Sequence, residues 1–366
     1  MVEWKKLGEF LDYQQPTKYL VKSTDYDESF GTPVLTAGQS LILGYTNEND
    51  GVFEASKENP TIIFDDFTTS FHWVDFPFKA KSSAMKMLLP KEGTNFRYVY
   101  YAMLQICFVP SQHQRHWISK YSHFTIPIPS LAEQERIVGI LDTFTAAIDN
   151  LKKQIELRKK QFEKYRDELL DHKGRDDMDY MSIKDIVKSY CTGATPKKNH
   201  LEYYEGGTIP WLRTQDVKFN EIYDIDTFVT DVAVKETGVK WIPANCVIVA
   251  ISGATAGRCA INKIPTTTNQ HCLNLEIDSK KALYKYIYYC VYNAYAEMIA
   301  KKQGARGDLN TSIILGINIP VPLIKEQQRI VSILDTFESS IANLEKQLSL
   351  RQKQYEYYRN QLLTFE

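Results

Sequence analysis

The sequence predicts an α+β protein built from two mixed α/β domains, each dominated by a bent sheet, and two long helices. Three observations predict this fold class. A long segment occurs twice, its apolar spacing is typical of coiled coils, and the region before each copy is rich in short β-branched and aromatic runs. Together they indicate an internal duplication with approximate twofold symmetry.

The repeat joins residues 126–170 to residues 319–363, which lie 193 positions further on, and 27 of these 45 positions are identical. A repeat of this period sets the architecture before any local assignment. We therefore predict four segments: a first domain at 1–125, a central long helix at 126–175, a second domain at 176–318 and a C-terminal long helix at 319–366.

Each copy opens with the motif I-P-[IV]-P, at Ile126–Pro129 and at Ile319–Pro322. The prolines keep the approach extended and prevent a helix from starting before them. Apolar residues then follow at steps of four and three, as in Ile137, Leu141 and Phe144. This spacing predicts coiled-coil helices of roughly 40 residues, about 60 Å long.

An arginine interrupts the apolar spacing once in each copy, at Arg158 and at Arg351. Two interpretations remain open. In the first, each guanidinium reaches solvent over its aliphatic stem. In the second, the pair fixes the register of the helices or meets a carboxylate of a partner protein.

The regions before the two helices also look like diverged copies. R-Y-V-Y-Y at Arg97–Tyr101 parallels K-Y-I-Y-Y at Lys285–Tyr289, and I-I-F-D-D at Ile62–Asp66 parallels V-I-V-A-I at Val247–Ile251. Little else repeats, which is how a scaffold is kept while its surface loops change. The tyrosines at alternate positions are interpreted as packing residues of two helices: Tyr98, Tyr100, Tyr286 and Tyr288.

Composition places the chain among globular proteins, with 43% hydrophobic and 24% charged residues and a net charge of −1. No run of about 18 apolar residues exists, so no transmembrane helix is expected. Six cysteines without a C-x-x-C pair argue against a disulfide framework or a zinc site and favour a reducing cytoplasm. A nucleic-acid partner would require basic side chains concentrated on one face.

Motifs of self-contained enzymes are absent. The sequence has no G-x-x-x-x-G-K-[ST] loop and no dinucleotide fingerprint. Asp65 and Asp66 form a carboxylate pair, but no nearby Glu-x-Lys completes a nuclease-like metal site, so a polar turn or a base-reading loop is favoured there. We expect no catalytic residue and no metal site in this chain.

The chain resembles the specificity subunit of type I restriction–modification systems over essentially its whole length. The motif I-P-[IV]-P-x-x-x-E-Q-x-R-I-V-x-I-L-D occurs in both copies. The second variable region adds G-A-T-P at Gly193–Pro196 and G-G-T-I-P-W at Gly206–Trp211. The first region departs from that pattern, with T-P-V-L-T-A-G at Thr32–Gly38, which implies a different subclass of recognition domain.

The resemblance implies that two target-recognition domains each read one half of an asymmetric, bipartite DNA site. It implies that the long helices pack antiparallel, set the spacer and dock two methyltransferase subunits. S-adenosylmethionine, ATP and Mg²⁺ are then expected in the methyltransferase and motor/endonuclease subunits, with no cofactor in this one. Residues of the repeated motif and the two interrupting arginines are the expected partner contacts: Glu133, Gln134, Arg136, Arg158, Glu326, Gln327, Arg329 and Arg351.

DNA affinity would come from Lys and Arg on phosphates, and specificity from side chains on base edges. Loops between strands that combine charge with amide or hydroxyl groups are the predicted DNA contacts, although a solvated loop is an equally good interpretation for any one of them. In the first domain they are Lys22, Ser23, Thr24, Gln39, Thr68, Thr69, Lys81, Ser82, Ser83, Gln112 and Arg115. In the second they are Lys197, Lys198, Asn199, Arg213, Thr214, Gln215, Thr267, Thr268, Asn269, Gln270, Lys302 and Arg306.

Two other classes of function remain open. The first is a non-catalytic coiled-coil adapter whose variable domains bind proteins, and near-neutral charge does not exclude it. The second is a DNA methyltransferase or nuclease with an unrecognised site. Salt-dependent binding to duplex DNA discriminates against the adapter, and methyl transfer by the isolated chain would identify the enzyme.

Overall fold

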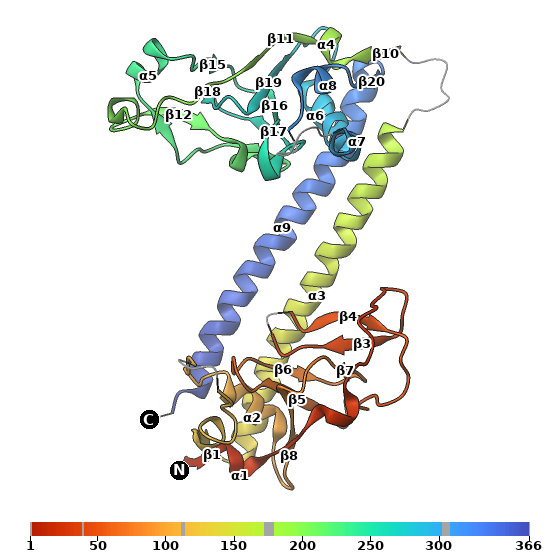
Figure 1. The fold of residues 1–366 in the computed structure, drawn as a ribbon, viewed down its shortest axis with the longest axis vertical. Helices are drawn as coiled ribbons and strands as arrows, with labels where there is room; N and C mark the ends of the chain where they lie inside the picture. The colour runs from red at the N-terminus through yellow and green to blue at the C-terminus, as the bar shows by residue number, and fades with distance from the viewer. Residues whose placement is uncertain (1, 39, 111–113, 172–178, 302–307, 366) are drawn as a thin grey trace. The chain divides into compact units, whose positions relative to one another are not determined.

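The computed structural model describes residues 2–38, 40–110, 114–171, 179–301 and 308–365 (Figure 1). The chain divides into two compact units. Unit 1 contains Met1–Lys152 and Lys346–Glu366, and unit 2 contains Lys153–Glu345. Each long helix therefore contributes one half to each unit. No helix of the described residues is long and apolar enough to cross a membrane.

Unit 1 contains a four-stranded antiparallel sheet in the order β2-β8-β5-β6, a three-stranded sheet β4-β3-β7 and the pair β1-β9. Helix α2 packs against the four-stranded sheet, and Asn95 caps it by accepting a hydrogen bond from the Tyr98 backbone N–H at 3.1 Å. The elements are β1 (Glu3–Lys6), α1 (Leu7–Phe10), β2 (Leu11–Gln14), η1 (Pro16–Tyr19), β3 (Thr32–Leu35), β4 (Ile42–Thr46), β5 (Thr61–Asp65), β6 (Phe71–Val74), β7 (Lys79–Ala80), β8 (Met85–Pro90), α2 (Phe96–Met103), η2 (Tyr121–His123) and β9 (Thr125–Ile128).

Unit 2 contains a five-stranded sheet in the order β11-β19-β16-β17-β13, a four-stranded sheet β14-β12-β18-β15 and the pair β10-β20. The elements are β10 (Asp179–Ser182), α4 (Ile183–Ile186), β11 (Val187–Thr192), η3 (Leu201–Tyr203), β12 (Ile209–Leu212), η4 (Thr214–Asp216), β13 (Asn220–Ile222), β14 (Phe228–Val229), α5 (Asp231–Glu236), β15 (Trp241–Ile242), β16 (Val247–Ala250), η5 (Gly253–Thr255), β17 (Cys259–Asn262), β18 (Thr266–Thr268), β19 (Cys272–Ile277), α6 (Tyr284–Asn293), α7 (Tyr295–Ala300), α8 (Thr311–Leu315) and β20 (Asn318–Val321).

The two segments that the sequence aligns, Ile62–Asp66 and Val247–Ile251, form strands β5 and β16. Each strand pairs on both sides, β5 with β6 and β8, and β16 with β17 and β19. Burial on both faces explains why they are continuous apolar runs rather than alternating ones. All six cysteines are free, as expected for a chain without a disulfide framework.

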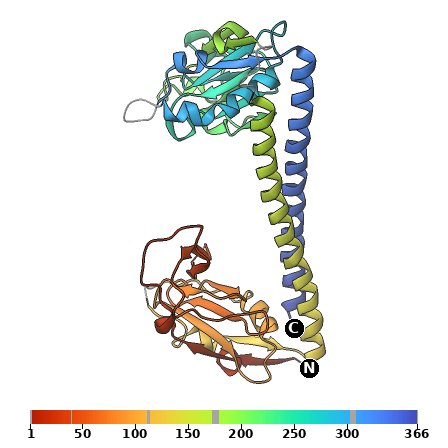
Figure 2. The same ribbon diagram turned by 90° about the vertical axis from the view of Figure 1, so that its right-hand side faces the viewer.

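The long helices begin directly after the proline motifs, α3 at Leu131–Leu170 and α9 at Ile324–Leu363. In unit 1, Phe144 of α3 stacks on Tyr358 of α9 with ring centroids 5.3 Å apart. In unit 2, Tyr165 of α3 stacks on Phe337 of α9 at 5.2 Å. An early residue of one helix thus meets a late residue of the other, so the helix segments within each unit run antiparallel (Figures 1 and 2).

The two interrupting arginines lie over aromatic rings of the opposite helix. Arg158 sits 5.8 Å from the ring of Phe337 in unit 2, and Arg351 sits 5.7 Å from the ring of Phe144 in unit 1. A guanidinium above an aromatic face is attracted by the ring quadrupole. Both arginines therefore contribute a cation–π contact between the helices, and Arg351 is at the same time exposed to solvent.

Candidate nucleic-acid interface

Four loops of unit 1 meet at one edge of its sheets, and hydrogen bonds between them fix their arrangement. Asp66 links two of them, because its N–H donates to Ala84 O at 3.1 Å and its carbonyl accepts from His116 N at 2.8 Å. His72 Nε2 lies 2.7 Å from Gly38 O, and Lys81 N–H donates to Leu35 O at 3.0 Å. We call residues 36–38, 65–70, 81–84 and 114–117 the first loop surface.

A buried ion pair lies beneath the first loop surface. Lys86 Nζ and Asp66 Oδ2 are 3.0 Å apart, and both side chains are 2% exposed. The other oxygen of Asp66 accepts hydrogen bonds from the backbone N–H groups of His116 and Trp117, at 3.1 and 2.8 Å. Lys86 also lies 4.7 Å from the ring of Tyr13. Asp66 therefore orients the 114–117 loop, so the carboxylate pair predicted from sequence belongs to a structural turn.

The other carboxylate of this pair, Asp65, shapes the β5–β6 turn. Its Oδ1 accepts hydrogen bonds from the backbone N–H groups of Phe67 and Thr68, both at 2.8 Å. Thr69, which follows, has φ of 59°, an unusual conformation for a β-branched residue. These hydrogen bonds within the turn fix its conformation, and Thr68 is exposed on it.

The predicted DNA contacts of the first domain lie in or beside this surface. Thr68, Lys81, Ser82, Ser83 and Arg115 are exposed within it, whereas Thr69 is 7% exposed. Lys81 Nζ donates to Tyr26 Oη at 2.9 Å, which ties the surface to the segment after Lys22, Ser23 and Thr24. Gln39 and Gln112 lie outside the described residues.

Glu48 holds the segment Lys22–Thr24 in place. Its Oε1 accepts the backbone N–H groups of Lys22 and Ser23 at 2.9 and 2.8 Å, while its other oxygen lies 2.9 Å from Lys79 Nζ. The hydrogen bond from Ser23, with help from Lys79, keeps the pKa of Glu48 below its usual value despite burial. The Lys22 side chain itself is exposed and pairs with Asp50 at 2.9 Å.

Loops of unit 2 converge in the same way. Ala194 N–H donates to Thr268 O and Asn269 N–H donates to Leu212 O, each at 3.0 Å, and Ile251 N–H donates to His271 O at 2.9 Å. A Cβ on Gly193 would overlap the Thr268 carbonyl, which explains the glycine of the G-A-T-P motif. We call residues 193–199, 213–216, 251–257 and 269–271 the second loop surface.

Three predicted contacts of the second domain are exposed together on one of these loops: Lys197, Lys198 and Asn199. Gln270 is exposed, and its Oε1 accepts a hydrogen bond from Thr195 Oγ1. Gln215 is exposed and Thr214 is partly exposed. Lys302 and Arg306 lie outside the described residues.

Three other predicted contacts are buried in unit 2. Thr267 and Thr268 are 0% exposed, because they belong to strand β18 inside the four-stranded sheet. Thr267 Oγ1 donates to Pro210 O at 2.8 Å, and Thr268 Oγ1 accepts from Asn274 Nδ2 at 2.8 Å. Asn269, 9% exposed, accepts the His271 N–H at 3.1 Å. These residues support the loops from below, and Thr267 and Thr268 do not reach the surface in this structure.

Arg213 stands out because part of its guanidinium is buried without a partner. Its Nε has no hydrogen-bond acceptor among the described residues, and its Nη2 lies 3.6 Å from Asp226 Oδ1. Its backbone N–H donates to Asp216 Oδ2 at 2.8 Å, which fixes the start of η4. The side chain keeps 30% of its surface exposed at the second loop surface.

The residues of the repeated E-Q-x-R motif make the same contacts in each unit. Arg136 binds Glu133 with two hydrogen bonds of 2.8 and 2.7 Å, and Arg329 binds Glu326 with the same two distances. Gln134 Nε2 donates to Pro129 O at 3.0 Å, and its counterpart Gln327, which is buried, donates to Pro322 O at 2.8 Å. The glutamines therefore fasten each helix start to its proline motif, while the exposed Glu–Arg pairs face solvent.

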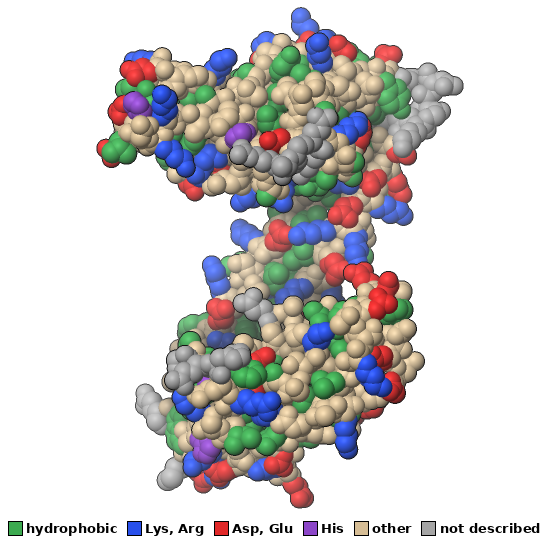
Figure 3. Space-filling model, in the orientation of Figure 1, with side chains coloured by type: hydrophobic (Ala, Val, Ile, Leu, Met, Phe, Trp, Pro, Cys, Tyr) green, Lys and Arg blue, Asp and Glu red, His purple; other side chains and the backbone are tan. Residues whose placement is uncertain are grey.

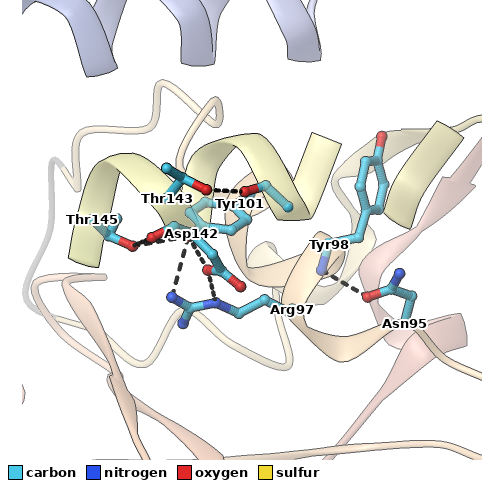
Figure 4. A network of polar contacts seen from close by, with 8 residues as sticks. Asn95, Arg97, Tyr98, Tyr101, Asp142, Thr143 and Thr145 are labelled. Carbon is cyan, nitrogen blue, oxygen red and sulfur yellow. Dashed lines mark hydrogen bonds and ion pairs between the residues drawn. The ribbon is translucent and has the colours of Figure 1, made fainter. Parts of the chain in front are cut away.

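A polar cluster at the repeated tyrosine motif links each domain to its long helix. In unit 1, Asp142 of α3 accepts hydrogen bonds from Arg97 Nε at 2.7 Å and from Tyr101 Oη, and Thr145 lies beside them (Figure 4). Tyr98 Oη donates to Pro127 O at 2.7 Å. As the sequence predicts, the tyrosines of this motif pack at the helix: Tyr98 and Tyr286 are 0% exposed.

The matching cluster of unit 2 contains more acidic residues. Tyr289 Oη lies 2.6 Å from Asp335 Oδ1 and 2.9 Å from Glu338 Oε2, so its one proton is shared between the two carboxyl groups. Lys285 Nζ lies 3.0 Å from Asp335 Oδ1 and 2.9 Å from Glu221 Oε1. Glu338 takes the place that Thr145 has in unit 1, and burial raises its pKa to about 7.

Charge is not segregated on the face that Figure 3 draws, where basic and acidic side chains are interspersed over both units. This distribution agrees with the net charge of −1. Binding to an anionic polymer would therefore depend on local groups such as Lys197 and Lys198 rather than on a broad positive field.

The family model described as "Type I restriction modification DNA specificity domain" matches residues 1–159 and 175–351. The specificity subunit of the type I restriction enzyme EcoR124I/EcoR124II of Escherichia coli is 43% identical, over 100% of this chain and 94% of that protein. A putative type I restriction enzyme specificity subunit of Haemophilus influenzae is 28% identical, over 100% of this chain and 96% of that protein.

Two solved structures share the fold. An S subunit of a type I restriction–modification system from M. genitalium aligns with a TM-score of 0.67 at 15% identity, covering 100% of this chain and 97% of that chain. A chain from a structure of the assembly and conformational transition of the type I R-M system aligns with a TM-score of 0.58 at 15% identity, covering 99% and 96%. By the match of the family model and the identity along its full length, this chain belongs to the type I restriction–modification DNA specificity subunit family.

Proposed function

We propose that this chain confers DNA sequence specificity on a type I restriction–modification complex, with each unit reading one half of a bipartite, asymmetric site. The observation that carries the proposal is the convergence of loops rich in Lys, Ser, Thr and Gln at one edge of each unit. These loops differ between the units while the strands beneath them correspond. Different loops on matching scaffolds suit two different half-sites.

The exposed residues of the loop surfaces divide by chemistry. Lysines such as Lys81, Lys197 and Lys198 would bind phosphates, which gives affinity without sequence preference. Gln215 and Gln270 present amides suited to adenine edges, and Arg213 and Arg115 present guanidinium groups suited to guanine. Each good bidentate pair would contribute about 1–3 kcal/mol of discrimination.

The long helices would set the distance between the half-sites. We propose that they form an antiparallel coiled coil along their length and that it relates the predicted domains, 1–125 and 176–318, by a pseudo-twofold axis. Support comes from the repeated contacts, since Phe144–Tyr358 and Phe337–Tyr165 are the same pair in repeat positions. Exposed apolar residues at matching positions, Leu157 at 59% and Leu350 at 53%, suit two equivalent docking sites for methyltransferase subunits.

In this proposal the chain performs no chemistry. The methyltransferase subunits would bind S-adenosylmethionine, and the motor subunits would use ATP and Mg²⁺ to translocate and cleave DNA. The adapter hypothesis, in which the variable domains bind proteins, is the second candidate.

Binding to duplex DNA distinguishes these two. The chain reconstituted with its methyltransferase subunits should bind DNA that contains the site, and log K should fall linearly with log[salt], with a slope of about −0.9 for each phosphate contacted. The isolated chain should not transfer methyl groups, and adding the methyltransferase subunit should restore transfer. Binding that shows no salt dependence, or no preference for the site, would favour the adapter.

An insertion in the central helix should change the spacer. Adding four residues after Leu157 lengthens α3 by about 6 Å, which is one to two base-pair steps. We expect a longer spacer between two unchanged half-sites, detected by sequencing methylated DNA from a host that carries the variant. Lys153→Ala, an exposed substitution in the same helix that keeps its length, is the control. An unchanged spacer in the insertion variant would show that α3 does not set the distance.

A further inference from the structure

Unit 1 contains a groove of about 1270 Å³ whose walls come from the end of the sheet, from α2 and from the segments of α3 and α9. Trp73 and Tyr100 form its aromatic wall, and Tyr355 faces them from α9. Arg97 lies at its base, 4.5 Å from the Trp73 ring.

The groove follows a sheet edge that unit 2 covers and unit 1 leaves open. Strand β6 corresponds to β17, since each is antiparallel to the central strand of its unit. In unit 2 a further strand, β13, pairs with β17 in parallel. In unit 1, β6 ends its sheet and no strand of the described residues pairs beyond it, although the Tyr100 hydroxyl oxygen accepts a hydrogen bond from the Trp73 backbone. An open strand edge is a template for another extended segment.

In unit 2, the residues of strand β13 show which kinds of side chain pack beside this edge. Glu221 of β13 binds Lys285 at 2.9 Å, and Phe219, just before β13, stacks on Tyr292 with centroids 4.1 Å apart. Arg97 holds the position of Lys285 in the repeated motif. Its one ion pair among the described residues is with Asp142, whereas Lys285 pairs with both Asp335 and Glu221.

Charge at the groove also favours an acidic occupant. Arg359 faces it from α9 with its Nε buried and without a hydrogen-bond partner among the described residues. Apart from His72, the lining has five cations and four acids, and two ion pairs already join Arg97 to Asp142 and Lys152 to Asp149, so the excess is one positive charge. The lining residues that carry charge are Lys57, Arg97, Lys152, Lys353 and Arg359, with Asp75, Asp142, Asp149 and Glu356.

We propose that this groove binds an extended segment of a partner protein, which lies along the open edge of β6 and presents a carboxylate to Arg97. The segment would make main-chain hydrogen bonds with β6 and place an aromatic or apolar side chain between Trp73 and Tyr355. The proposal concerns protein binding and does not depend on DNA reading by the loop surfaces.

The test uses a labelled peptide with the sequence of residues 216–225 of this chain, which contains Glu221, added to the full-length chain. We expect saturable binding by fluorescence anisotropy below about 1 mM, weakened about tenfold when the peptide carries Glu221→Gln. The same peptide with a benzophenone side chain in place of Phe219 should crosslink to residues 71–75 and 97–101.

Two substitutions on the protein complete the design. Ser349→Trp places an indole in the groove and should weaken binding about tenfold. Glu156→Trp, at the same repeat position in unit 2, should leave binding unchanged. Three results would each overturn the proposal: no saturable binding, equal affinity of the Glu and Gln peptides, or crosslinks confined to residues 258–263, where the peptide would have displaced β13. DNA binding by the complex is measured separately, so its loss would not be mistaken for any of these results.

Discussion

Replacing Asp66 with asparagine is expected to destabilise unit 1 by about 3–5 kcal/mol, because the substitution leaves the buried Lys86 without its counter-charge. The asparagine oxygen still accepts the N–H groups of His116 and Trp117, but its amide group faces an ammonium. Hydrogen exchange of the β5, β6 and β8 amides measures the loss as a lower opening free energy. We also expect the Asp66→Asn variant to lose recognition of the first half-site.

Two controls separate the charge effect from general damage. In the double variant Asp66→Asn, Lys86→Met the buried charge is gone, and most of the stability should return. Lys22→Ala breaks an exposed pair, with side chains 75% and 71% exposed, and should cost less than about 1 kcal/mol. If Asp66→Asn cost no more than Lys22→Ala, the buried pair would not be what holds the first loop surface.

Unit 2 is expected to lose stability as the pH rises through 7, because Glu338 must ionise in a partly buried site. Its pKa is about 7 in the folded chain and near 4.5 when unfolded. Between these values the folded state binds the extra proton, so the stabilisation is complete below pH 4.5 and is lost as the pH rises through 7. The shift corresponds to about 3 kcal/mol. Denaturation monitored in unit 2 from pH 5 to 8 measures it.

The repeat supplies the control for this prediction. Glu338→Thr gives unit 2 the residue that unit 1 has at Thr145, and Glu338→Gln removes the charge while keeping the shape. Both variants should flatten the pH dependence of unit 2 over this range. A profile that stays as steep in both variants would assign the titration to another member of the cluster, which includes Asp335, Glu221, Lys285 and Tyr289.

The long helices and the central strands were predictable because their signals are local. Proline motifs mark where α3 and α9 begin, and continuous apolar runs mark β5 and β16. The pairing partners of those strands depend on contacts between residues far apart in the sequence. Hydrophobic periodicity carries no information about such contacts. Strand β13 covers one sheet edge and has no counterpart among the described residues of unit 1, and hydrophobic periodicity does not indicate it.

Some of the candidate DNA contacts are exposed, as predicted from the sequence, and others are buried. Clusters such as Lys81–Ser83 and Lys197–Asn199 are exposed loops, as their composition indicates. Thr267 and Thr268 have the composition of a loop, but they are buried in β18, because threonine favours strands and its hydroxyl can bind a carbonyl within the sheet. Composition alone does not distinguish these two situations.

The residues that shape the loop surfaces from below were not predicted as such. Asp66 contacts Lys86, twenty positions away, and His116, fifty positions away, and only the fold brings these residues together. Glu338 and Thr145 align in the repeat, which could have identified a difference between the two units. Glu338 lies against Tyr289 of α6, and the burial that raises its pKa cannot be inferred from the sequence of its own helix.

Exchanging residues 1–122 for the matching segment of a homologue tests whether each unit reads its own half-site. Methylated adenines are mapped across the genome of a host that carries the exchanged chain and the methyltransferase subunit. We expect a new first half-site, an unchanged second half-site and an unchanged spacer. A change in both half-sites, or in neither, would contradict independent reading by the two loop surfaces.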